Sequence, residues 1–128
     1  MNIAEFCDQH DACEEGRKWA LANCADMADA WATAKPEWLL WIAVQPGVLT
    51  DREIRIFAYR CARGAQDTFW AFSLIETLVA AEDGDLRIVT TWIARNARSE
   101  PATKFAQAEY LRANCKPNFE NRMEKENA

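Results

Sequence analysis

Residues 28–63 read ADAWATAKPEWLLWIAVQPGVLTDREIRIFAYRCAR, and this stretch holds three of the six tryptophans of the chain. Pro36 suits the first turn of a helix, where the N–H group that proline lacks needs no partner. Pro46-Gly47 is a strong turn signal and ends that helix. The apolar residues between these two signals recur at helical spacing. The stretch therefore predicts a helix over residues 36–45, with an apolar stripe from Trp38 through Trp41 to Ile42.

A capping box starts the next helix, which is expected over residues 50–64. Thr50 is the N-cap, and the Glu53 carboxylate is expected to reach back to the N–H group of Thr50. Apolar residues then recur every three or four positions and give this helix a narrow buried face: Ile54, Phe57, Ala58 and Cys61. Because only a short Pro-Gly connection separates the two helices, we expect them to pack as a helical hairpin.

The rest of the chain also shows helical periodicity, and no stretch shows the sustained period-two alternation of a strand. Asn2 is a candidate cap for the first helix and Asp11 for the second, while Asp83-Gly84-Asp85 forms a turn. The further helices are expected at residues 2–9, from Asp11 to about Cys24, and at 25–34, 66–82, 86–98 and 102–114.

Each of these helices is expected to turn one face inward. The residues assigned to these faces are Ile3, Phe6 and Cys7; Cys13, Gly16, Ala20, Leu21 and Cys24; Met27, Ala30, Trp31 and Ala34; Phe69, Phe72, Ile75, Leu78 and Val79; Leu86, Val89, Ile93 and Ala97; and Phe105, Ala108 and Leu111. We therefore predict an all-α fold, a single compact domain of about six to seven short helices packed as helical hairpins without a sheet. This domain is expected to span residues 1–118, and residues 119–128 form a polar tail that frays unless Phe119 docks.

The charge of the chain is placed unevenly along it. The formal net charge is −5, and residues 1–40 carry eight acidic against three basic residues, an excess that equals the whole net charge. Without a basic face, direct nucleic-acid binding is not expected. An acidic end fits either a basic partner protein or a solvated surface that aids solubility.

Cysteine usage and hydropathy point to a cytoplasmic protein. The five cysteines are an odd number, and the start of the chain lacks the basic and apolar regions of a signal peptide. We therefore expect reduced thiols, mostly buried as small apolar residues. No apolar run approaches the ~20 residues that a membrane span needs.

Catalytic and metal chemistry find little support in the residues. Cys7, His10 and Cys13 lie at intervals of three and could place three ligands along one side of a helix, but a structural zinc takes four and the usual paired C-x2-C knuckles are absent. The single histidine, with a cysteine, could also form a nucleophile–base pair, but it has no supporting pattern around it. The chain has no glycine-rich phosphate loop. We expect no catalytic residue, no metal ligand set and no cofactor.

The tryptophans raise the possibility of a binding surface, since aromatic residues are enriched at protein interfaces. Trp31, Trp38, Trp41 and Trp92 fit the inward stripes of their helices. Trp19 and Trp70 fit less well and are the candidates for exposed anchors.

A resemblance covers the stretch quoted first. Ala30-Trp31, the W-L-L-W run of Trp38 to Trp41, Asp51-Arg52 and the C-A-R of Cys61 to Arg63 follow the pattern of a family of small helical immunity proteins from bacterial toxin–immunity loci, with relatives in phage and prophage. QAEYLRANCKPNF, residues 107–119, is similar to a terminal element of related phage-type sequences, with Pro117-Asn118 in place of N-P. The resemblance implies an all-helical, non-enzymatic protein that binds and neutralises another protein, and it carries over no catalytic residue.

The sequence thus yields one leading functional hypothesis and two alternatives. The first is an immunity-type inhibitor that blocks a basic toxin or nuclease through an acidic, aromatic-containing surface. The residues assigned to this surface are Asp8, Asp11, Glu14, Glu15, Trp19, Asp26 and Asp29. The alternatives are a phage-encoded inhibitor of host defence, such as an anti-CRISPR that occupies a nucleic-acid channel, and a structural or accessory phage protein that acts as a homodimer.

Overall fold

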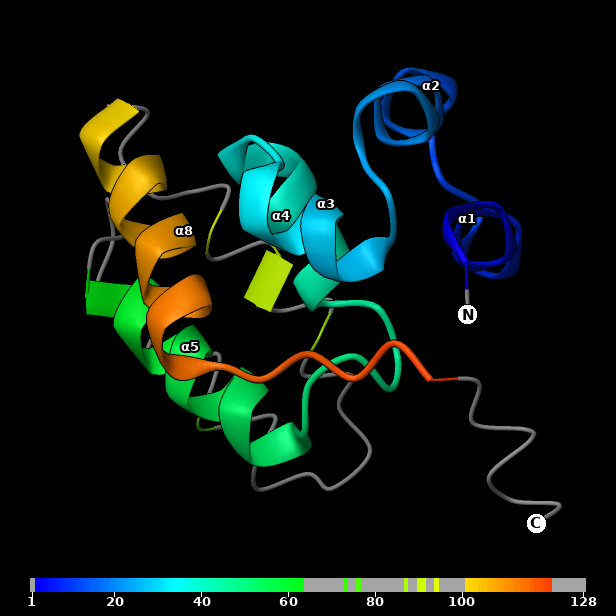
Figure 1. The fold of residues 1–128 in the computed structure, drawn as a ribbon. Coiled ribbons are helices and arrows are strands. Elements are labelled where there is room, and N and C mark those ends of the chain that lie inside the picture. Colours follow the sequence, from blue (N-terminus) through cyan, green and yellow to red (C-terminus); the bar gives the residue numbers. More distant parts are fainter. Residues whose placement is uncertain are drawn as a thin grey trace, which may run out of the picture.

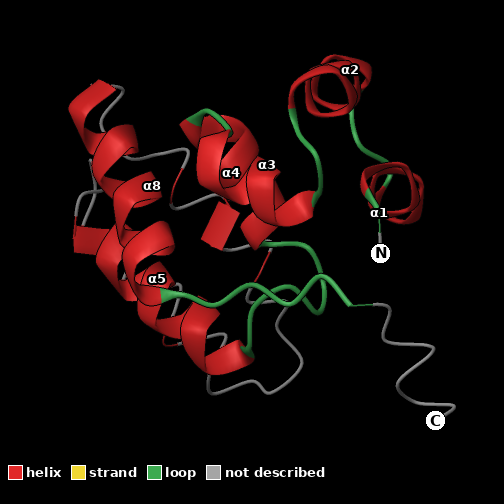
Figure 2. Ribbon diagram, in the orientation of Figure 1, coloured by secondary structure: helices red, strands yellow, loops and turns green. Residues whose placement is uncertain are grey.

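The computed structural model describes residues 2–63 and 101–120, together with Ser73, Glu76, Arg87, Thr90, Thr91 and Ala94. The helices are α1 (Ile3–His10), α2 (Glu14–Asn23), α3 (Met27–Thr33), α4 (Pro36–Ala43), α5 (Asp51–Arg63) and α8 (Pro101–Asn114). The described part contains no strand, which confirms the all-α prediction (Figure 2). None of its helices combines the length and the apolar character needed to cross a membrane. The predicted helices over 66–82 and 86–98, and with them Trp70 and Trp92, lie outside the described residues apart from the six single positions, each of which is helical.

Side-chain caps start two helices, α1 and α5, as the sequence predicts. The Asn2 side chain accepts from the N–H of Glu5 at 2.8 Å at the start of α1. At α5 the capping box is complete: the Thr50 N–H donates to Glu53 Oε1 at 3.0 Å, and the Glu53 N–H donates to Thr50 Oγ1 at 3.1 Å. Each cap satisfies a backbone donor that the first turn of a helix leaves without a partner.

The predicted role of Asp11 is wrong, because this residue ends α1 and does not start α2. Its backbone lies in the left-handed region, with φ of 55°, and its N–H bonds to the carbonyl of Cys7. Aspartate is one of the few residues that adopt this conformation at low cost. The N-cap of α2 is Cys13, whose Sγ accepts from the N–H of Gly16 at 3.4 Å.

The helices form two groups that meet at α3 and α4 (Figure 1). Helices α1 and α2 pack on each other as a hairpin, while α4 lies between α3 and α8. The hairpin expected between α4 and α5 is therefore not the main packing of α4. Helix α5 instead lies against α8, where the rings of Phe57 and Tyr110 stack with centroids 6.2 Å apart.

The core is built on the stripes that the sequence assigns to α3 and α5. Met27, Ala30, Trp31 and Ala34 are all buried, and so are Ile54, Phe57, Ala58 and Cys61. In α4 the buried face is Leu39, Ile42 and Ala43, whereas Trp38 and Trp41 are half-buried along its margin. Helix α4 has neighbours on two sides, so its small and branched side chains enter the core and the larger indoles cover its edges.

Two residues assigned to inward faces are exposed. Leu21 of α2 has 51% of its surface exposed, and Phe105 of α8 has 58%. Within α2 only Ala20 is buried, since one side of this short helix contacts the rest of the protein. The apolar periodicity of α2 therefore does not mark a core stripe.

Arg112 of α8 joins two elements far apart in the chain. Its Nε donates to the carbonyl of Trp31 at 2.9 Å, and its Nη2 donates to the carbonyl of Ala34. These carbonyls lie at the carboxyl end of α3, where a helix leaves acceptors unsatisfied and where a positive charge is favoured. The guanidinium thus links α8 to the carboxyl end of α3.

After α8, residues 115–120 run as an extended segment back toward α1 (Figure 1). The N–H of Lys116 donates to Glu53 Oε2 at 3.0 Å, and the N–H of Asn118 donates to the carbonyl of Val48 at 2.7 Å. Phe119 then docks with its ring 5.8 Å from that of Phe6. This segment ties α5, the α4–α5 connection and α1 together.

Replacing Arg112 by alanine should lower the free energy of unfolding by about 2 kcal/mol or more, because two half-buried carbonyls lose a charged donor. Denaturant unfolding of the full chain measures this loss. Arg55→Ala on the exposed side of α5 is the matched control and should cost less than about 0.5 kcal/mol. Equal losses in the two variants would contradict the role assigned to Arg112.

Glu53 should make stability depend on acidic pH. Burial of this carboxyl acts to raise its pKa, but the hydrogen bonds from the N–H groups of Thr50 and Lys116 outweigh burial, so the pKa lies below the ordinary value of 4.5. A lowered pKa in the folded state stabilises the protein above the unfolded value, and this contribution is lost as the pH falls from there through the folded pKa. Glu53→Gln should therefore cost about 1 kcal/mol at neutral pH and progressively less below pH 4.5. Thermal melts over this pH range test the prediction, with Glu109→Gln on the exposed side of α8 as control; a gap that stays constant with pH would refute it.

Candidate functional site

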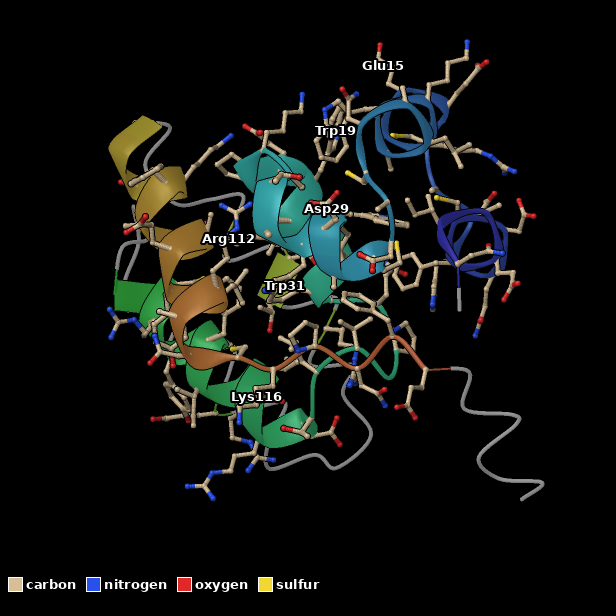
Figure 3. All side chains as sticks on the ribbon, in the orientation of Figure 1. Glu15, Trp19, Asp29, Trp31, Arg112 and Lys116 are labelled. Atoms are coloured by element: carbon tan, nitrogen blue, oxygen red, sulfur yellow. The ribbon has the colours of Figure 1, made fainter. Side chains whose placement is uncertain are left out.

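The outer side of the α1–α2 hairpin carries three of the seven residues that the sequence assigns to partner binding: Asp11, Glu14 and Glu15. Glu14, Lys18 and Leu21 of α2 are spaced by four and three residues and are all exposed, so they form one outward stripe. Glu15 also points away from the body of the protein (Figure 3). Asp11 lies exposed in the connection that leads into this helix. We call Asp11, Glu14, Glu15, Lys18 and Leu21 the hairpin surface.

Two acids of the predicted set have basic neighbours on the same hairpin. Asp8 forms an ion pair with Arg17 that links α1 to α2. Glu14 pairs with Lys18 at 3.0 Å along one side of α2, and both side chains are largely exposed. Asp11 and Glu15 have no ion-pair partner among the described residues. An exposed pair contributes little to stability, so Glu14 can exchange its lysine for another cation at small cost.

The last two predicted acids shape the start of α3. Asp26 Oδ1 accepts from the N–H of Asp29 at 2.8 Å, and Asp29 Oδ2 accepts from the N–H of Ala25 at 3.0 Å. Together they hold the α2–α3 connection in place and provide negative charge at a helix N-terminus. Asp26 and Asp29 therefore have a local structural role, and Asp29 is half-buried.

Trp19 is not the exposed anchor that the sequence predicts. It is half-buried and reaches from α2 toward α4, where its ring lies 5.3 Å from that of Trp38 (Figure 3). This contact attaches the hairpin to the rest of the protein. The large apolar residue exposed on the hairpin is Leu21, whose spacing in the sequence had predicted an inward position. Its spacing from Glu14 and Lys18 is the signal that places it on the polar side.

A pocket of about 280 Å³ opens where the hairpin meets α3 and α4. Side chains from α1 to α4 line it, and most of them are apolar. The aromatic walls come from Phe6, Trp19, Trp38 and Trp41, while Cys13 lies in the lining at the start of α2. Gly16 has no side chain at this point of the wall. A Cβ atom here would lie 3.9 Å from the Trp38 ring and 3.3 Å from Cys13 Sγ, so any side chain would narrow the pocket.

Among the described residues, Glu37 is the one carboxylate that lines this pocket. Its own N–H group bonds the carboxylate and lowers its pKa, and Lys104 lowers the pKa further through a contact of 3.3 Å between Nζ and Oε1. The side chain therefore carries its negative charge at neutral pH. Nearby, Lys35 Nζ lies 4.2 Å from the centre of the Trp38 ring.

Cys7, His10 and Cys13 do not meet as a ligand set. Cys7 is buried, Cys13 caps α2, and the His10 ring packs on Phe6 with centroids 4.5 Å apart. Burial lowers the pKa of His10 and raises that of Cys7. Within the described ranges no three or more His, Cys, Asp or Glu side chains converge as metal ligands would.

Comparisons with protein-family models, with curated proteins and with solved structures find no match to this chain.

The five thiols should react at very different rates. Cys13 is exposed and Cys24 half-buried, whereas Cys7, Cys61 and Cys115 are buried. Burial raises the pKa of Cys61 to about 12 and that of Cys115 to about 11, so the reactive thiolate is scarce at both. Titration with a thiol reagent should label Cys13 first and Cys24 next, and the three others only after unfolding. Cys13→Ser should remove the fastest phase; a fast phase that survives this change would contradict the exposure of Cys13.

Proposed function

We propose that this protein is a non-enzymatic, cytoplasmic inhibitor of the immunity type, which binds a basic partner protein through the hairpin surface. The observation that carries the proposal is the composition of that surface, in which three exposed acidic residues at or just before the start of α2 share the hairpin with the exposed Lys18 and Leu21. Acidic residues speed the approach of a basic partner and select against acidic ones. The exposed leucine on the same helix offers an apolar surface from which water is released on binding.

The hairpin surface suits a partner that is itself built to hold nucleic acid. Such a protein presents a row of cations to phosphates, and a surface bearing Asp11, Glu14 and Glu15 can oppose those cations. A toxin nuclease and a nucleic-acid channel of a host defence complex share this chemistry. Both versions of the inhibitor hypothesis therefore rest on the same residues, and the partner that is captured distinguishes them.

The test uses the tagged full chain to recover proteins from host lysate at low and high salt. We expect one basic protein at low salt, and loss of it at high salt because exposed charges are screened. The variant Asp11→Asn, Glu14→Gln, Glu15→Gln should weaken its binding by about tenfold or more and flatten the salt dependence. Leu21→Ser should weaken binding at every salt concentration. The purified partner should also lose its activity on nucleic acid when the wild-type chain is added.

The matched control replaces acids outside the hairpin, Asp51→Asn with Glu109→Gln, and should bind like the wild type. Asparagine tolerates the left-handed conformation of residue 11, so the triple variant is expected to fold, and circular dichroism checks this. Equal weakening by the control would remove the hairpin surface from the proposal. Recovery of only the chain itself, in an oligomer that Phe105→Ser dissociates, would instead favour the homo-oligomeric accessory protein, because Phe105 is exposed on α8.

A further inference from the structure

The pocket between the hairpin and α4 has the composition of a site for an organic cation. Aromatic rings form its walls, and a ring presents negative charge density on its face that attracts a cation. Trp38 shows this behaviour within the chain itself, since Lys35 Nζ lies 4.2 Å from the centre of its ring. The volume of about 280 Å³ is at the lower limit of ligand pockets and exceeds the ~150 Å³ in which a buried apolar cavity already holds benzene.

A carboxylate at the same pocket favours a cationic ligand over a neutral or anionic one. Glu37 lines the pocket, and the hydrogen bond from its own N–H group keeps it ionised. Its ion pair with Lys104 is exposed and 3.3 Å long, so it is weak and can be exchanged. The acidic residues of the hairpin add to the negative potential around this end of the molecule.

We propose that this pocket binds a small organic ammonium ion, whose flat apolar body lies among Phe6, Trp19 and Trp38 and whose cation lies at Glu37. The site is separate from the hairpin surface, since the pocket lies on the inner side of α2 and the hairpin surface on the outer side. The inference does not depend on the identity of a protein partner.

Three probes of similar shape and different charge test it: 1-naphthylmethylammonium, 1-naphthylmethanol and 1-naphthoate. Calorimetry measures their affinities for the full chain, and the indole N–H signals of Trp19 and Trp38 report the place of binding. The ammonium should bind about threefold to tenfold more tightly than the alcohol, and the carboxylate more weakly than either.

Two variants should move the preference for the cation in opposite directions. Glu37→Gln should bring the affinity for the ammonium down to that for the alcohol. Lys104→Met should raise the affinity for the ammonium, because it removes the cation that competes for Glu37. Neither change should alter binding of the alcohol by more than about twofold, a pattern that altered folding alone would not produce.

A third variant tests the location. Gly16→Ala adds a methyl group within contact distance of the Trp38 ring, so it should weaken ammonium and alcohol alike. The same methyl group lies 3.3 Å from Sγ of the cap Cys13, so circular dichroism checks that α2 is intact in this variant. The proposal is overturned if none of the probes binds, if the carboxylate binds as tightly as the ammonium, or if the preference for the cation survives Glu37→Gln. Binding that leaves the signals of Trp19 and Trp38 unchanged would equally overturn it.

Discussion

The last carbonyls of α3 have no hydrogen-bond donor within that helix. The packing of the described fold depends on the side chain that donates to them. Arg112, contributed by α8 from about eighty residues further along, donates to the carbonyls of Trp31 and Ala34. A lysine has a single charged atom and could not match two carbonyls with the same planar fork. With α8 linked to the end of α3 by this side chain, helix α4 lies between the two helices and buries Leu39 and Ala43 completely. The chain after α8 then reaches Val48, Glu53 and finally Phe6.

The α1–α2 hairpin is attached to this body by aromatic contacts on its inner side. Phe6 packs on Trp41 and Phe119, and Trp19 packs on Trp38. Large rings meet at their edges and leave space between them, and Gly16 keeps that space open. On the outer side the described residues make no such ring contacts, and this side carries Asp11, Glu14, Glu15, Lys18 and Leu21. The two sides of the hairpin therefore differ in character: the inner side is mostly apolar and aromatic, and the outer side is charged.

The sequence predicted those features of the structure that depend on residues close together in the chain. The Thr50–Glu53 box and the Asn2 cap depend on residues three apart, and the structure forms both. The failures concern features that a local pattern leaves open. Asp11 was predicted to begin α2, but it adopts the left-handed conformation that ends α1, and Cys13 caps α2 in its place. On helices as short as α2, almost any apolar residue fits a stripe, so periodicity could not show that Trp19 turns inward and Leu21 outward. Asp26 and Asp29, which were assigned to the partner surface, form hydrogen bonds at the start of α3.

The central claim is that α2 rests on α4 through Trp19 and Trp38, which creates the pocket and determines which side of the hairpin faces solvent. Nuclear Overhauser contacts between the two indole rings in solution measure this directly, since the ring centroids lie 5.3 Å apart. The account predicts strong cross-peaks between these rings, together with cross-peaks between Phe6 and Phe119. If the Phe6–Phe119 contact were present while the two indoles showed none, α2 would not rest on α4. The pocket and the assignment of the two sides of the hairpin would then both be wrong.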